Sequence, residues 1–149
     1  MIPVEDELVK QLYKPSQWKV NSNPEDYDRR TIYLIAKRNL RLPFMESFDA
    51  PALQTSCSRR ESSTHAPQAL ELLNGKLSND LARSFARRLK EERAGHPSKE
   101  AIVERAYSLA AGRPPTNQEK RLAEEFLAKE PLEEFALAMF NLNSFLYVE

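Results

Sequence analysis

The chain has 149 residues with 22 basic and 22 acidic side chains, so its formal net charge at pH 7 is zero. That length fits one domain, and 41% hydrophobic with 30% charged residues is typical of a protein with a buried core and a hydrated surface. One cysteine, three glycines and ten prolines exclude a disulfide-stapled mini-protein and a collagen. No uncharged apolar run approaches the ~18 residues of a membrane span, and the N-terminus MIPVEDELVK lacks the features of a secretion signal.

Residues 1–64 are predicted to form an irregular arm. Glu5–Tyr13 has the four-residue apolar spacing of a short helix, and the following loop is expected to be anchored by Trp18 and Tyr27. The run TIYLIA at Thr31–Ala36 is β-branched and aromatic, which makes it the best strand candidate in the chain. It has no obvious partner of the same quality.

Residues 65–149 are predicted to be helical. The first helix is expected to be capped by Ser63 or Thr64, with Pro67 in its first turn, where the missing N–H costs nothing. Gly75 is a point at which this long segment can divide into two helices. Its apolar stripe has three- or four-residue spacing and consists of Leu70, Leu73, Leu77, Leu81, Phe85 and Leu89.

Three further helices have clear terminal signals. Ser98 is expected to cap one that Gly112 closes, Thr116 and Glu119 have the spacing of a capping box, and Pro131 opens the last. The apolar faces predicted for the last two helices are Leu122, Ala123, Phe126 and Leu127, and Phe135, Ala138, Met139 and Leu142. The final SFLYVE is apolar and is expected to be docked.

These signals predict a mainly α fold: a helical bundle of four or five helices behind the irregular arm, with one short strand or hairpin as the only possible β structure. We expect residues 1–149 to form a single domain.

Cys57 and His65 are the only pair with the character of a nucleophile and a base. They lie in a loop that leads into a helix, and a helix N-terminus lowers the pKa of a thiol. Glu61 is the only nearby carboxylate, and no glycine-rich oxyanion loop is present. A lone cysteine is more often a small buried hydrophobic residue, so a structural role is favoured. With His65 and His96 as the only histidines, no metal site is expected.

Basic side chains are in excess in the middle of the chain. Residues 29–93 hold thirteen basic and seven acidic side chains, including the doublet Arg59 and Arg60. Such an excess can bind phosphate or a polyanion, but the pI near 6.8 and the absence of a readable motif argue against a nucleic-acid partner. Ion pairing within the protein is the favoured role. A further hypothesis is helical protein–protein interaction, in which the basic residues 83–93 and the acidic residues 124–134 face each other within the fold or across a dimer.

Several stretches, read together, resemble one family. They are PVEDELVKQLYKPSQW at 3–18, DRRTIYLIAKRNLRLPFMESFDAP at 28–51, SCSRRESSTHAPQALELLN at 56–74, RAYSLAAGRPPTNQE at 105–119 and FALAMFNLNSFLYVE at 135–149. This combination resembles the C-terminal part of the planctomycete-type domain of unknown function 1553, which accompanies cytochrome c-like domains. The family-like blocks contain Cys57, Arg59, Arg60, Gln68, Asn74 and Arg113.

The resemblance implies a piece of a large, exported or cell-envelope, multidomain protein, with haem only in a separate domain and no cofactor in this chain. It implies no known activity or catalytic residue. Our first hypothesis is a non-catalytic structural or binding module whose partners are other domains of the parent or a polysaccharide. The alternative is a contribution to an enzyme site for a sulfated, phosphorylated or uronate substrate, with Arg59 and Arg60 binding the anion beside Cys57 and His65.

Overall fold

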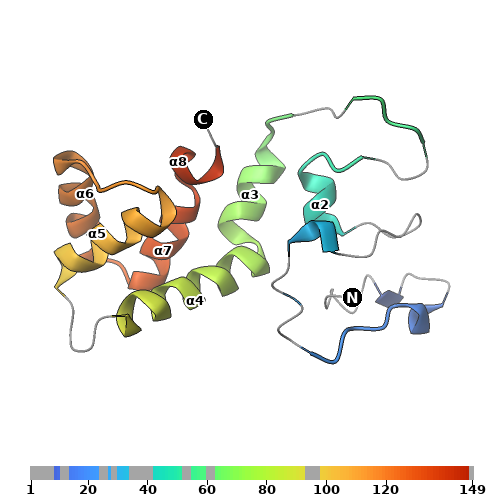
Figure 1. Cartoon of the computed structure of the whole chain (residues 1–149), viewed down its shortest axis with the longest axis horizontal. Coiled ribbons are helices and arrows are strands. Elements are labelled where there is room, and N and C mark those ends of the chain that lie inside the picture. The colour runs from blue at the N-terminus through green and yellow to red at the C-terminus, as the bar shows by residue number, and fades with distance from the viewer. Residues whose placement is uncertain are drawn as a thin grey trace. The chain divides into compact units, whose positions relative to one another are not determined.

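The computed structural model describes residues 9–10, 14–23, 27, 30–33, 42–51, 55–59, 63–92 and 98–147. The chain divides into two compact units, Met1–Thr64 and His65–Glu149. Within the described residues the regular structure is helical throughout, which confirms the predicted mainly α fold (Figure 1).

The first unit contains short helical turns joined by loops. A 3-10 helix spans Pro15–Gln17, and the α-helix α2 spans Pro43–Ser47. Trp18 is buried, as expected of an anchor, and the Tyr27 hydroxyl donates to the Asn21 carbonyl at 2.5 Å. Of the helix predicted over residues 5–13, only residues 9 and 10 are described, and both are helical.

The strand predicted at residues 31–36 is wrong for residues 31–33, which are the part of this run that the structure describes. Thr31–Tyr33 forms a 3-10 helix, and Ile32 and Tyr33 are exposed at 80% and 72%. Residues 34–36 lie outside the described residues. The tendency of β-branched and aromatic residues to form strands depends on neighbours that cover them, and these two side chains are not covered.

The second unit is a small helical bundle. Its helices are α3 (Ala66–Asn74), α4 (Lys76–Glu91), α5 (Lys99–Ala110), α6 (Asn117–Leu127), α7 (Leu132–Phe140) and α8 (Asn143–Leu146). Figure 1 shows α7 between α4 and the pair formed by α5 and α6. The apolar helix α7 is therefore the centre of the bundle.

The core consists of large side chains from α7 packed on small side chains of its neighbours. Met139 and Val103 are the largest fully buried side chains. The remaining buried members are Ala82, Ala86, Leu89, Ala106, Tyr107, Ala123, Leu132, Phe135, Ala136 and Leu137. Ala82 and Ala86 on α4 are small enough to let α7 approach closely.

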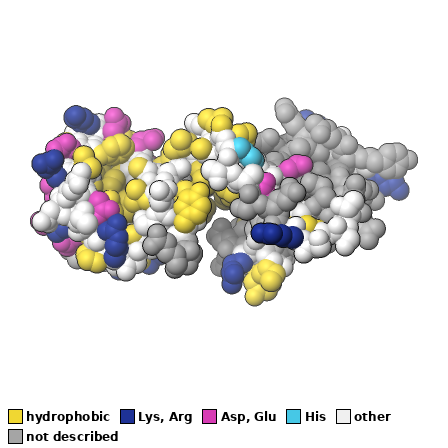
Figure 2. Space-filling view, turned by 90° about the horizontal axis from the view of Figure 1, so that it is seen from above, with side chains coloured by type: hydrophobic (Ala, Val, Ile, Leu, Met, Phe, Trp, Pro, Cys, Tyr) yellow, Lys and Arg dark blue, Asp and Glu magenta, His cyan; other side chains and the backbone are white. Residues whose placement is uncertain are grey.

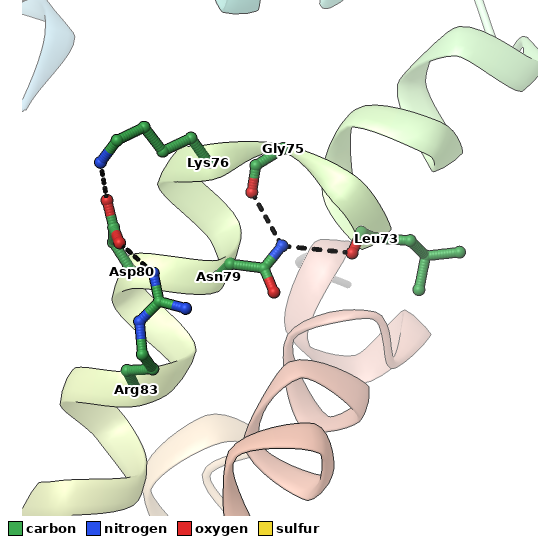
Figure 3. Close-up of polar contacts among 6 residues, drawn as sticks. All are labelled: Leu73, Gly75, Lys76, Asn79, Asp80 and Arg83. Atoms are coloured by element: carbon green, nitrogen blue, oxygen red, sulfur yellow. Dashed lines mark hydrogen bonds and ion pairs between the residues drawn. The ribbon is translucent and has the colours of Figure 1, made fainter.

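The division at Gly75 is confirmed, and the apolar stripe is buried only toward its far end, at Phe85 and Leu89. α4 buries Ser78, Ala82, Ala86 and Leu89, whereas four leucines of the stripe are 45–58% exposed, namely Leu70, Leu73, Leu77 and Leu81. Asn79 holds the break by donating to the carbonyls of Gly75 at 3.0 Å and Leu73 at 3.5 Å (Figure 3). The buried face of α4 is thus rotated away from Leu77 and Leu81.

The helix caps were predicted with mixed success. Ser98 caps α5 by accepting from the Ala101 amide at 3.3 Å, and Thr116 and Glu119 form the predicted capping box. Gly112 has a φ of 66°, as expected of a helix-terminating glycine. The predicted cap of α3 is wrong, because His65 occupies the N-cap position without a side-chain hydrogen bond.

Two predicted faces also need correction. Leu122 is 53% exposed on α6, where only Ala123 is buried, and Ala138 is exposed on α7. The chain end is less deeply docked than expected: Phe145 stacks near Phe140 with ring centroids 5.0 Å apart, yet it is 44% exposed.

Candidate functional site

The segment 56–65, which carries the predicted nucleophile and anion-binding residues, is only partly described. Cys57, Arg59 and His65 are all exposed, and Arg60 lies outside the described residues. The Cys57 thiol donates a hydrogen bond to the backbone carbonyl of Arg59 at 3.0 Å. This contact closes a local turn. The expectation that Cys57 is a small buried residue is therefore wrong, since its side chain faces solvent.

The candidate residues fall in two separate units of the chain, and Arg60 lies outside the described residues. Cys57 and Arg59 belong to the first unit, and His65 begins the second, where its backbone carbonyl accepts from the Gln68 amide at 3.1 Å. Exposed side chains lack the desolvated surroundings that strengthen catalytic electrostatics. No specific observation therefore favours the enzyme alternative.

An anchor at Ser63 was missed by the sequence analysis. The Asp49 carboxylate accepts from the Ser63 amide at 2.6 Å and from its hydroxyl at 2.8 and 2.9 Å. Asp49 has a φ of 55°, a left-handed conformation that aspartate tolerates better than most residues. This pair joins the end of segment 56–63 to the turn after α2. It also explains why Ser63 does not cap α3.

The best-organised polar cluster lies at the turn between α5 and α6. Arg113 makes two parallel hydrogen bonds to Glu119, at 2.9 and 2.7 Å, and its guanidinium lies 5.8 Å from the centre of the Tyr107 ring. Glu119 also accepts from the Thr116 amide at 2.7 Å. We call Tyr107, Arg113, Thr116 and Glu119 the turn lock. The hydrogen bonds of the turn lock hold the turn after α5 against the start of α6.

The charges of the turn lock perturb one another. The Arg113 guanidinium, helped by the amide and hydroxyl of Thr116, lowers the pKa of Glu119 to about 2 against a smaller opposing effect of burial. The hydrogen bonds to Glu119 raise the pKa of Arg113. Burial is the main cause that raises the pKa of Tyr107. Both members of the Arg113–Glu119 pair therefore stay charged over the whole neutral range.

Most other charged contacts join helices or brace one helix. Lys120 bridges from α6 to Glu104 at 2.7 Å and to Glu100 at 3.6 Å on α5. Lys90 on α4 pairs with Glu133 on α7 at 3.1 Å, so one predicted contact between the basic and acidic regions forms within the fold. These exposed pairs contribute little individually to stability.

A second junction involves Glu92, just after α4. Glu92 accepts from Arg105 of α5 at 2.6 Å and from Arg88 of α4 at 2.5 Å, and these two bonds lower its pKa to about 2. The contact pins the end of α4 to α5. Local ion pairing is thus the role of Arg88 and Arg105, in agreement with the favoured interpretation.

The described residues also leave large apolar side chains exposed on the helical unit, and Figure 2 shows apolar side chains over one of its faces. We use the name leucine–aromatic surface for seven of these exposed side chains: Leu70, Leu73, Leu77, Leu81, Phe145, Leu146 and Tyr147. A row of three aromatic rings lies beside these side chains. The ring centroids of Phe85, one turn after Leu81, and Phe140 are 5.3 Å apart, and the Phe140 ring also contacts the Phe145 ring. This surface is the second feature that the sequence analysis missed, because the stripe was expected to be buried.

Two kinds of site are absent from the described part of the chain. None of its histidine, cysteine and carboxylate side chains gather in a group of three or more that could hold a metal ion. Likewise, none of the helices found there combines the length and apolar character needed to cross a membrane. The leucine–aromatic surface and the turn lock are the features left for a functional interpretation.

The chain belongs to the family described as PSD1, Protein of unknown function (DUF1553), whose model it matches over residues 3–127. The match includes the first unit and helices α3 to α6, and it contains the turn lock. Residues 135–149, which also resemble the family, lie beyond the matched stretch, so their resemblance stays a prediction. No curated protein and no solved structure matches the chain.

Proposed function

We propose that the chain is a non-catalytic structural and binding module of a larger multidomain protein. The observation that supports this proposal is the exposed leucine–aromatic surface on a helical unit whose core is already filled. Large exposed apolar patches mark protein–protein or membrane interaction sites or ligand-binding grooves. The candidate catalytic residues, by contrast, are exposed and lie in two different units.

The size of the leucine–aromatic surface supports a binding role. A fully exposed aromatic side chain presents ~200 Å², and a leucine slightly less. Because the seven members are each 36–59% exposed, together they leave about 600 Å² of side-chain area in water. The sum is taken over side chains of α3, α4 and the chain end; a single contiguous patch on a typical monomer reaches ~300–600 Å².

The context of the module follows from the resemblance rather than from the fold. In this proposal the parent is an exported or cell-envelope protein that carries a cytochrome c-like domain elsewhere, and haem binds only there. The module packs against other domains of the parent, with an anionic polysaccharide as a further ligand class for the exposed arginines. The support for this placement is the resemblance of the sequence blocks at 28–51, 56–74 and 105–119.

A comparison of two pairs of variants in the parent protein tests the proposal. Cys57→Ser with His65→Ala is expected to leave any activity of the parent unchanged, because neither side chain would take part in chemistry. Leu77→Glu with Leu81→Glu is expected to weaken the association of the module with its partner while the helical content stays the same. Loss of activity in the first pair, at unchanged folding, would contradict the non-catalytic assignment.

A further inference from the structure

We propose that the joint between α3 and α4 is a two-state elbow, bent in this structure and able to straighten into one continuous helix over residues 66–91. The bend lies at a single residue, Gly75 (Figure 1). Its φ of −60° has the helical value, and only its ψ of 141° departs from the helical value of about −42°. Rotation about one backbone bond therefore separates the two states. The elbow does not depend on the proposed binding role.

The backbone hydrogen bonds of Gly75 follow the helical pattern on both sides. Its amide donates to the Glu71 carbonyl at 2.8 Å, and its carbonyl accepts from the Asn79 amide at 3.1 Å. Both bonds join residues four apart, as in a continuous helix. The amides of residues 76–78 begin α4, and the glycine before them has no side chain that could cap them. In the straight state these amides would pair with the carbonyls of residues 72–74, which completes the helical hydrogen-bond pattern.

Side chains hold the bent state by donating to carbonyls at the end of α3. The Asn79 amide group donates to the carbonyls of Leu73 at 3.5 Å and Gly75 at 3.0 Å (Figure 3). Asn141 of α7 donates to the Leu72 carbonyl at 3.5 Å. The two bonds of 3.5 Å are long for N–H···O hydrogen bonds and are therefore weak. Replacing them with backbone bonds would cost the protein little.

The packing of α3 also offers little resistance to straightening. None of its nine residues, all of which are described, is buried. Ser78 is buried at the start of α4, and its hydroxyl donates to the Glu71 carbonyl at 3.3 Å. Inside a helix a serine hydroxyl bonds a carbonyl three or four residues earlier, so Ser78 would find a partner in the straight state too.

The apolar pattern of the sequence is continuous across the bend. Four leucines keep three- and four-residue spacing through residue 75: Leu70, Leu73, Leu77 and Leu81. This spacing is that of one face of a single helix. In the bent state the four side chains are 45–58% exposed and belong to two helices. A partner that contacts α3 and α4 together would therefore bind the two states with different affinities and shift their populations.

The distance between two spin labels on the full chain, measured by double electron–electron resonance, tests the proposal. The labels are attached to Ala69→Cys and Arg87→Cys in a Cys57→Ser background, because Cys57 is the only cysteine of the chain. Both labelled positions are exposed. A straight helix would separate their Cα atoms by about 27 Å, and a bend shortens that distance. The wild type is expected to show mainly the short distance.

Two variants are expected to favour the long distance. In the bent state, Gly75→Ala would bring a Cβ too close to the Glu71 carbonyl oxygen, whereas alanine is favoured inside a straight helix. Asn79→Ala removes the side-chain bonds that hold the bend. The ratio of long to short distances is expected to rise at least ~10-fold in Gly75→Ala and ~3-fold in Asn79→Ala. Ser84→Ala, at an exposed position of α4 away from the elbow, is the matched control and is expected to keep the wild-type distances.

The double variant Gly75→Ala with Asn79→Ala decides the outcome. A majority of label pairs at the long distance, with helical circular dichroism no weaker than that of the wild type, would support the elbow. A folded double variant that keeps the short distance would overturn the proposal, because packing rather than the joint would then fix the bend. A double variant that no longer unfolds cooperatively would overturn it as well, since the bent state would be the only folded one. A control that shifts as far as the variants would deny any special role to the joint.

Discussion

The turn lock makes a specific prediction about the charge of Glu119. Glu119→Gln keeps a side chain that can complete a capping box but removes the charge that Arg113 binds. The fall in pKa from 4.5 to about 2 would correspond to ~3 kcal/mol if all of it were transmitted to stability. Water screens part of this interaction, because 27% of the side chain is exposed. We therefore expect a loss of about 1–2 kcal/mol at pH 7.

The same reasoning fixes the pH dependence. The carboxyl group of Glu119 has a lower pKa in the folded chain than in the unfolded chain, so its contribution is complete above its ordinary pKa of 4.5 and is lost as pH falls through about 2. The difference in unfolding free energy between wild type and Glu119→Gln is thus expected to shrink steadily between pH 5 and pH 2. Urea unfolding of the full chain, followed by circular dichroism across that range, measures this difference.

A control on the same helix separates the turn lock from a general charge effect. Glu125 is 64% exposed, and its carboxylate lies 3.8 Å from Arg121. Glu125→Gln is expected to change stability by no more than ~0.5 kcal/mol at any of these pH values. Equal effects of the two variants at pH 7, or a Glu119→Gln effect that does not vary with pH, would refute the assignment of the pKa shift to the turn lock.

Three further predictions concern the backbone, the core and the first unit. Gly75→Ala is expected to lower the free energy of unfolding by about 1–3 kcal/mol, because a Cβ at residue 75 would lie 2.4 Å from a backbone oxygen of α3. Gly112 has a φ of 66° and open space around it, so Gly112→Asn is expected to be nearly neutral in the same unfolding assay. Met139→Ala should cost about 2–5 kcal/mol, since the side chain is 2% exposed, and a cost below 1 kcal/mol would mean that the core is loosely packed. Asp49→Ala is expected to accelerate hydrogen exchange of the Ser63 amide at least ~10-fold without lowering the melting temperature of the helical unit. An unchanged exchange rate would show that Asp49 does not protect this amide.

The terminal signals of the helices could be predicted because their causes are local. Ser98 and Thr116 cap α5 and α6 through atoms three residues away, and Gly112 adopts its left-handed conformation regardless of distant neighbours. The break at Gly75 is similarly local. The pairing of Glu119 with Thr116 was predictable as a capping box, but the addition of Arg113 depended on how the two-proline turn folds back.

The exposed surface could not be predicted because helical periodicity identifies an apolar stripe and not its partner. On α4 the leucines and the alanines both recur at helical spacing, and the leucines are the more hydrophobic. α7 packs on Ala82 and Ala86, because small side chains permit a closer approach and more contacts per residue for the large side chains opposite. Leu77 and Leu81 are left in water as a result.

The sequence alone therefore determined the helical class, the break at Gly75 and the caps of α5 and α6, since each depends on interactions within a few residues. Only the tertiary structure decided which face of α4 is buried, that Arg113 locks the turn before α6, and that Asp49 holds Ser63 from fourteen residues away. Those outcomes depend on which elements meet in space. The packing of α7 against α4 sets which side chains stay exposed, and the hydrophobicity of a single residue does not.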